Sequence, residues 1–216
     1  MKTSKKDVWL LLGLTVFFSI TGLYIWRVYR VNHLALTDLA PSVQEYSMGQ
    51  EIPLPPGFYN RGYLDQSGYQ VQVTDCALCR VNELAERGYI SHEEQKTIQH
   101  LTDDELIIIV SARFRFEGDG DPLNGIIDMS DYQVVGPDYY INCSTILNET
   151  GLFNKFLSGS SAFSIASGRN VDVQIPFIVD TTSVHALDKE FIFDNGIKLL
   201  LSRYPLELYV KLELPQ

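Results

Sequence analysis

The chain has 216 residues, of which 45% are hydrophobic and 12% aromatic, so it is rich enough in apolar side chains to fold and is not a disordered tail. Its formal net charge is −10 at pH 7. Five of the 17 basic residues but only Asp7 of the 27 acidic residues lie before residue 31, which leaves residues 31–216 with 12 basic and 26 acidic residues, a net charge of −14. Such a field repels nucleic acid, which we exclude as a partner.

The first element is a run of nineteen uncharged, mainly apolar residues from Val8 to Trp26. A membrane-spanning helix needs about 20 such residues, because hydrocarbon cannot satisfy backbone polar groups. Trp9 lies at one end of the run, and further aromatic residues lie at the other, as in the aromatic belts of membrane interfaces. We therefore predict a cytoplasmic tail over residues 1–7 and a transmembrane helix over residues 8–29.

The charges that flank this run predict its orientation. Before it lie three lysines and one aspartate, and after it two arginines: Lys2, Lys5, Lys6, Asp7, Arg27 and Arg30. This bias places the N-terminus in the cytoplasm and the remainder of the chain outside it, at the cell membrane. The alternative is a cleaved signal peptide, but the run is longer than the about 7–15 apolar residues of such a peptide and no small-x-small cleavage site follows.

Prolines then interrupt the chain, and we predict a stalk over residues 30–45 and a folded domain over residues 46–216. Within this domain apolar and polar residues alternate, which predicts antiparallel strands with one packed and one wet face. The long strands are expected at 69–74, 106–116, 171–179 and 206–214, and shorter ones at 48–54, 132–135, 191–193 and 197–201. Pro176 cannot donate a ladder hydrogen bond, so its strand is expected at an edge.

Short helices are predicted at three places between these strands. The first spans residues 81–88 and ends at Gly88. The second begins with the capping box Ser91-His-Glu-Glu94 and runs to about residue 101, and the third spans residues 148–157. The expected fold is therefore mainly β, an immunoglobulin-like antiparallel β-sandwich with a short helical insert, preceded by one transmembrane helix. A β-barrel is the alternative.

Cys76 and Cys79 have the C-x-x-C spacing of a redox pair or of half a zinc site. No second C-x-x-C is present, and no βαβ pattern surrounds the pair. Three cysteines in an exported domain leave one unpaired, so the most economical interpretation is a structural disulfide that joins Cys143 to Cys76 or Cys79. We predict no metal site and no cofactor.

An acidic loop follows the strand at 106–116 and contains Asp119, Asp121 and Asn124. Its spacing fails the EF-hand register, which requires oxygen ligands at positions 1, 3 and 5, glycine at 6 and glutamate at 12. A solvated turn is favoured over a Ca²⁺ loop. The sequence also lacks a G-x-S-x-G elbow, a P-loop and a dinucleotide fingerprint, so no catalytic constellation is predicted.

The order of the motifs resembles a family of uncharacterised exported proteins of Gram-positive bacteria, the DUF5028 family. The resemblance rests on the strand phrases Tyr69–Asp75 and Leu106–Phe116, on Met129–Tyr140, on Phe163–Gly168 and on Ile175-Pro-Phe177. More distantly, the chain resembles immunoglobulin-like domains of Gram-positive surface lipoproteins, although it lacks the lipobox cysteine and carries a long helical insert at 80–104. The resemblance covers about residues 46–216 and implies fold and location, but no reaction.

Two functional hypotheses follow. The first is a membrane-anchored extracytoplasmic binding or assembly domain with a protein partner at the cell surface, which predicts an exposed apolar or aromatic patch. The second is an exported redox or metal-binding protein that uses Cys76 and Cys79, which predicts accessible thiols with a depressed pKa. The absence of a catalytic constellation from the sequence favours the first.

Overall fold

A computed structural model of the chain describes residues 14–15, 19–28, 41–60, 62–98, 101–103, 105–118, 126–179, 192 and 196–215. The chain divides into two compact units, residues 1–40 and 41–216. In the first unit, residues 19–28 are helical. No helix within the described ranges is long and apolar enough to cross a membrane. Most of the predicted transmembrane segment at 8–29 and most of the predicted stalk at 30–45 lie outside those ranges.

The second unit contains a five-stranded sheet whose order is β1-β13-β12-β8-β9. Its strands are β1 (Ser42–Ser47), β13 (Leu206–Leu212), β12 (Ile197–Ser202), β8 (Gln133–Val135) and β9 (Tyr140–Asn142). The expected sandwich was antiparallel throughout, and this is wrong for one pair: β1 runs parallel to β13, with Ser42 opposite Leu206. Strand pairing therefore begins at Ser42, before the predicted domain boundary at residue 46.

The second sheet has four antiparallel strands in the order β11-β6-β5-β2. They are β11 (Asn170–Val179), β6 (Leu106–Phe116), β5 (Tyr69–Arg80) and β2 (Glu51–Pro53). The alternation thus located the long strands correctly, although β5 extends to Arg80 and includes the C-x-x-C motif. Pro176 lies on an edge strand as predicted, because β11 has a neighbour on one side only.

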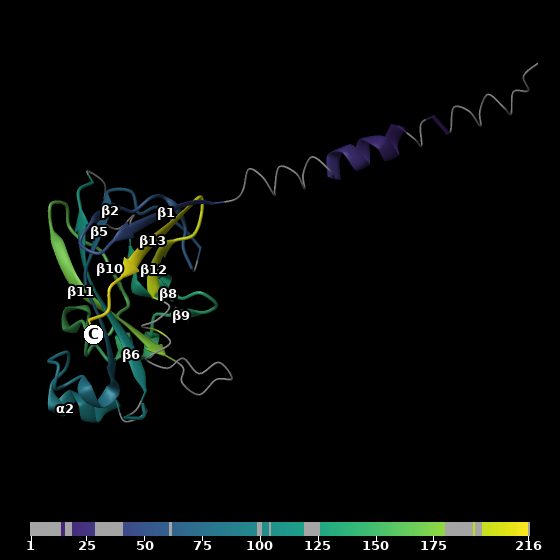
Figure 1. The fold of residues 1–216 in the computed structure, drawn as a ribbon. Coiled ribbons are helices and arrows are strands. Elements are labelled where there is room, and N and C mark those ends of the chain that lie inside the picture. Colours follow the sequence, from purple (N-terminus) through teal and green to yellow (C-terminus); the bar gives the residue numbers. More distant parts are fainter. Residues whose placement is uncertain are drawn as a thin grey trace, which may run out of the picture. The chain divides into compact units, whose positions relative to one another are not determined.

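The two sheets pack face to face over one main hydrophobic core, so the unit is a β-sandwich (Figure 1). Both sheets contribute alternate residues to it, as the period of two requires. Fully buried contributors from the four-stranded sheet and the five-stranded sheet are Val71, Val73, Ile108, Val110, Phe114, Ile175, Phe177, Val134, Leu199, Leu208 and Val210. The predicted β-sandwich is confirmed, whereas its immunoglobulin-like character stays a prediction.

A second, smaller core covers part of the outer face of the four-stranded sheet. Cys79 of β5 and Ile107 and Ile109 of β6 point into it, away from the main core. The apolar side chains that pack on them come from the helical insert between β5 and β6 and from the segment after β9: Val81, Leu84, Ile90, Ile98, Leu147 and Phe153. This second core leaves the rest of the outer face to solvent.

The helices that build this cover are shorter than predicted. They are η1 (Val81–Glu83), α2 (His92–Gln95), η2 (Lys96–Ile98), α3 (Thr145–Glu149) and η5 (Lys155–Leu157). The predicted capping box is confirmed, because the Ser91 hydroxyl accepts from the Glu94 amide and the Glu94 carboxylate accepts from the Ser91 amide. Gly88 adopts a φ of +79°, as its predicted terminating role requires.

Two small two-stranded sheets and one further turn complete the described elements. They are β3 (Gly57–Phe58) with β4 (Tyr63–Leu64), β7 (Ile127–Asp128) with β10 (Ala162–Phe163), and the 3₁₀ turn η4 (Met129–Asp131). The predicted strand at 191–193 lies almost entirely outside the described residues.

Candidate binding groove

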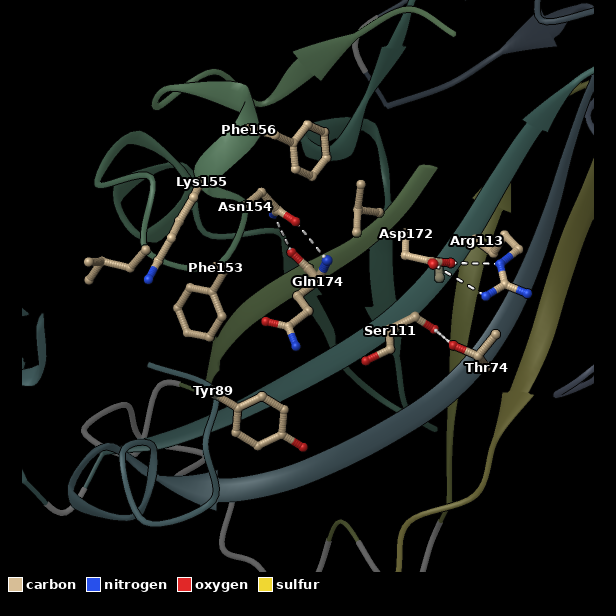
Figure 2. Close-up of a pocket in the computed structure, with 13 residues that line it drawn as sticks. Thr74, Tyr89, Ser111, Arg113, Phe153, Asn154, Lys155, Phe156, Asp172 and Gln174 are labelled. Carbon is tan, nitrogen blue, oxygen red and sulfur yellow. Dashed lines mark hydrogen bonds and ion pairs between the residues drawn. The ribbon is translucent and has the colours of Figure 1, made fainter. Parts of the chain in front are cut away.

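A groove of about 620 Å³ opens on the outer face of the four-stranded sheet, beside the second core. Its floor comes from β5, β6 and β11, one wall comes from the segment 152–156, and Tyr89 closes one end (Figure 2). The volume falls within the range of about 300–1,000 Å³ that is usual for ligand sites. The groove therefore joins a regular sheet surface to an irregular wall.

An ion pair across two strands forms the polar part of the floor. Arg113 of β6 and Asp172 of β11 are directly opposite in the ladder. The Nε of Arg113 donates to Oδ1 of Asp172 at 2.7 Å, and its Nη2 donates to Oδ2 at 3.2 Å (Figure 2). Asp172 raises the pKa of Arg113 through these bonds. Both side chains are exposed, so the pair orients two planar polar groups rather than adding much stability.

A β-bulge positions the next polar group. The ladder between β5 and β6 shifts register between Val73 and Asp75, which inserts Thr74 as an extra residue. The Thr74 hydroxyl donates to the backbone oxygen of Ser111 at 3.1 Å, beside the groove floor. The same bulge reverses which face the following residues of β5 use, so that Cys76 and Leu78 point into the main core.

Asn154 fixes the wall to the edge of the sheet. Its Oδ1 accepts from the Gln174 amide at 2.9 Å, and its Nδ2 donates to the Gln174 carbonyl at 2.7 Å (Figure 2). The side chain thus occupies two edge positions of β11 that a neighbouring strand would otherwise fill. Only 5% of Asn154 is exposed, so these bonds are shielded from water.

The residues around Asn154 supply the apolar part of the wall. Phe153 is buried in the second core, whereas Phe156 is 57% exposed at the rim of the groove. Lys155 forms an ion pair of 2.8 Å with Glu94 of α2, which ties the wall to the helical insert. That bond, together with the hydrogen bonds from Ser91, lowers the pKa of Glu94 to about 2.

The groove contains few side chains that titrate near neutral pH. The residues that line the groove include no histidine or cysteine, and their one carboxylate, Asp172, is engaged by Arg113. Burial raises the pKa of Tyr89, which therefore stays a neutral hydroxyl at ordinary pH. Within the described ranges, no three His, Cys, Asp or Glu side chains come together as a metal site would require. The groove offers a neutral polar floor and an aromatic rim to a partner.

The cysteines singled out in the sequence lie elsewhere. All three fall within the described residues, all three are buried, and all three are thiols, so the expected disulfide from Cys143 is not formed. Three residues of spacing along a strand put Cys76 and Cys79 on opposite faces, where they enter the main and the second core respectively. Burial raises the pKa of Cys76, which opposes formation of a reactive thiolate. This geometry does not support the redox or metal hypothesis.

Cys143 itself has a structural environment. Its Sγ accepts a hydrogen bond from Nδ2 of Asn148 at 3.0 Å, near the start of α3. The other predicted group, the acidic loop with Asp119, Asp121 and Asn124, lies outside the described residues.

Sequence reasoning missed Tyr89, Asn154 and Phe156 as groove residues. Arg113 and Asp172 were visible as outward-facing positions of two predicted strands, but only the register showed that they are partners. Asn154 left no signal in the sequence, because its contact with Gln174 spans 20 residues and depends on the path of an irregular segment.

Comparison with known proteins gives a family and a fold neighbour. The family model described as "Domain of unknown function (DUF5028)" matches residues 43–207. Among solved structures, the chain is similar to an uncharacterized β-sandwich protein from Clostridium difficile 630, whose crystal structure was determined at 1.90 Å resolution. The sequence identity is 8% and the TM-score 0.41, over 81% of this chain and 97% of that chain. No curated protein matches the chain.

Proposed function

The chain belongs to the DUF5028 family, a domain of unknown function, and we propose that it is a membrane-anchored extracytoplasmic domain that binds a protein partner at the cell surface. The groove on the four-stranded sheet is the contact surface. The observation that carries this proposal is the exposed aromatic rim at Phe156 beside a polar floor, since an exposed aromatic side chain over an oriented polar surface is typical of a recognition site.

Three sequence features support the location. The nineteen-residue uncharged run from Val8 to Trp26 has the length of a membrane anchor. The net charge of −14 over residues 31–216 keeps the domain soluble and away from anionic headgroups. The flanking charges favour a cytoplasmic N-terminus. The immunoglobulin-like form of the sandwich and the Gram-positive origin belong to the same proposal.

The groove also explains why the partner is expected to be a protein rather than a charged small molecule. Arg113 and Asp172 neutralise each other, as do Lys155 and Glu94, so the walls and floor carry little unbalanced charge. A mixed surface of this kind, apolar at one side and polar at the other, matches the core and rim of a protein interface. The binding energy is expected to centre on the exposed ring of Phe156, with Leu152 as a second apolar side chain of the groove.

Site-specific photo-crosslinking in intact cells tests the proposal. A photoreactive phenylalanine replaces Phe156 in the full chain, and a matched position, Tyr63, serves as control because it is equally aromatic, 61% exposed, and lies on the distant β3–β4 hairpin. We expect one discrete adduct from position 156 and no such adduct from position 63. The adduct should disappear when Ser111→Arg fills the groove floor.

Fractionation of the same cells tests the anchor separately. The full chain is expected in the membrane fraction, and protease added outside the cytoplasmic membrane should cleave it. Adducts that are identical from both positions, or an adduct that survives Ser111→Arg, would contradict the groove as the contact surface. Recovery of the full chain in the soluble fraction would contradict the anchor.

A further inference from the structure

A second groove, of about 560 Å³, lies on the outer face of the other sheet, the five-stranded one. Its residues come from β8, β9, β12 and β13 and from the two turns that contain Asn60 and Arg203. It shares no residue with the groove that contains Phe156. The two sites can therefore be tested independently.

Gln133 organises this second groove. Its neighbour Val134 points into the main core, so the Gln133 side chain lies on the outer face of the sheet, and yet only 2% of it is exposed. Its Nε2 donates to Oδ1 of Asn142 at 2.5 Å, and its Oε1 accepts from Nη2 of Arg203. A buried amide with both ends engaged holds Asn142 and Arg203 in fixed orientations.

The groove presents both donors and acceptors with little net charge. The guanidinium of Arg203 also approaches Oδ1 of Asn60 at 3.5 Å, and the Tyr209 hydroxyl donates to the Glu207 carboxylate at 3.0 Å. Arg203 and Glu207 carry opposite charges that offset each other within the site. Amide, carboxylate and guanidinium side chains are planar groups that can bind two neighbouring hydroxyls, one through each of two atoms.

Tyr140 adds an aromatic surface at the edge of the sheet. It lies on β9, the outermost strand, and is 66% exposed. Asn142, two residues further along the same strand, accepts through Oδ1, whereas its Nδ2 makes no hydrogen bond within the part of the chain that the structure describes. The hydrogen bonds of Gln133 use neither the exposed ring of Tyr140 nor the Nδ2 group of Asn142, so both of these groups remain available to a ligand.

We propose that this groove binds a neutral glycan, with one sugar ring stacked on Tyr140 and its hydroxyls bonded to Asn142 and Arg203. A hydroxyl both donates and accepts, which suits a site where amides and an Arg–Glu pair offer both. The C–H face of a sugar ring is apolar and packs on an aromatic face, while the hydroxyl rim needs polar partners. An anionic ligand is disfavoured by the net charge of −14 over residues 31–216.

Isothermal titration calorimetry on the full chain tests the proposal, in a detergent without a sugar headgroup so that the detergent does not occupy the site. The probes are three neutral hexasaccharides: chitohexaose, maltohexaose and mannohexaose. We expect at least one of them to bind with a Kd of about 1 mM or tighter. Tyr140→Ala should weaken that binding by about tenfold or more.

Asn142→Asp is the sharper variant, because it keeps an oxygen that accepts from Gln133 and replaces the outward amide donor with a charged acceptor oxygen. It should also weaken binding. Phe156→Ala, in the other groove, serves as the control and should bind the hexasaccharide unchanged. Absence of binding by all three probes would overturn the proposal. Binding that survives both Tyr140→Ala and Asn142→Asp would also overturn it.

Discussion

The outer face of the four-stranded sheet has one half that is buried and one half that is exposed to solvent. The outer face of β5 and β6 is buried where Cys79, Ile107 and Ile109 enter the second core. A few residues further along β6, the same face carries Arg113 and Arg115, which are exposed. One strand therefore has two solvent environments on a single face.

The difference between the two halves explains where the groove forms. The helical insert and the segment after β9 cover only one half of the face, so the border between covered and open halves becomes the groove. The apolar wall belongs to the cover, and the polar floor belongs to the open half. A groove of this kind forms wherever the segments that cover a sheet extend over only part of its face.

The largest expected effect comes from Ile109→Ala, which tests the covered half. Ile109 is about 1% exposed, and removing its side chain leaves a cavity in the second core. We expect a loss of about 2–5 kcal/mol in the free energy of unfolding, measured by urea denaturation. Arg113→Ala, on the same strand in the open half, is the matched control and should leave the stability nearly unchanged. Equal effects of the two substitutions would contradict the division of the face.

Asn154→Ala tests the contact between the segment 152–156 and the edge strand β11. It removes both hydrogen bonds to the Gln174 backbone and leaves a shielded amide and carbonyl unsatisfied. We expect a cost of about 1–3 kcal/mol. Native-state hydrogen exchange is the specific measurement, because exchange of the Gln174 amide should accelerate more than exchange at the central strand β6. Uniform acceleration throughout the sandwich would indicate a general loss of stability instead.

The pH dependence of stability tests the buried thiols. Burial raises the pKa of Cys76 in the folded state, so the unfolded chain releases its proton first as the pH rises. The stabilisation is therefore complete below the ordinary thiol pKa of about 8.5 and is lost progressively above it. Cys76→Ala should flatten the fall in unfolding free energy between about pH 8.5 and 10. A native chain whose Cys76 reacts rapidly with iodoacetamide at pH 8 would contradict the burial.

The smallest expected effect concerns the surface link between wall and insert. Lys155→Met removes the main cause of the lowered Glu94 pKa, which should rise from about 2 toward the ordinary value of 4.5. Titration of the Glu94 carboxyl by ¹³C NMR measures this shift. In the unaltered chain the contribution of Glu94 to stability is present above pH 4.5 and is lost as the pH falls toward 2. An unchanged pKa in Lys155→Met would show that Ser91 alone holds the carboxylate.

Much of this architecture was readable from alternation alone. The long strands at β5, β6, β11 and β13 follow from a period of two, and Pro176 predicted the edge position of β11. The continuous apolar run Leu106–Val110 also carried the signal of a segment buried on both faces, but we interpreted this strand as wet on one side. The helices came out shorter than expected because packing onto the sheet, rather than their own periodicity, stabilises them.

The sequence by itself determined the four long strands and the capping box at Ser91, because each depends on residues close together in the chain, and it left both a sandwich and a barrel open. Only the tertiary structure decided that Cys76 enters the main core and Cys79 the second core, since a single inserted residue at Thr74 reverses the face that the following residues of β5 use. It also decided where the cover stops and hence where the groove lies. These features depend on register and on contacts across the fold, and neither leaves a local pattern in the sequence.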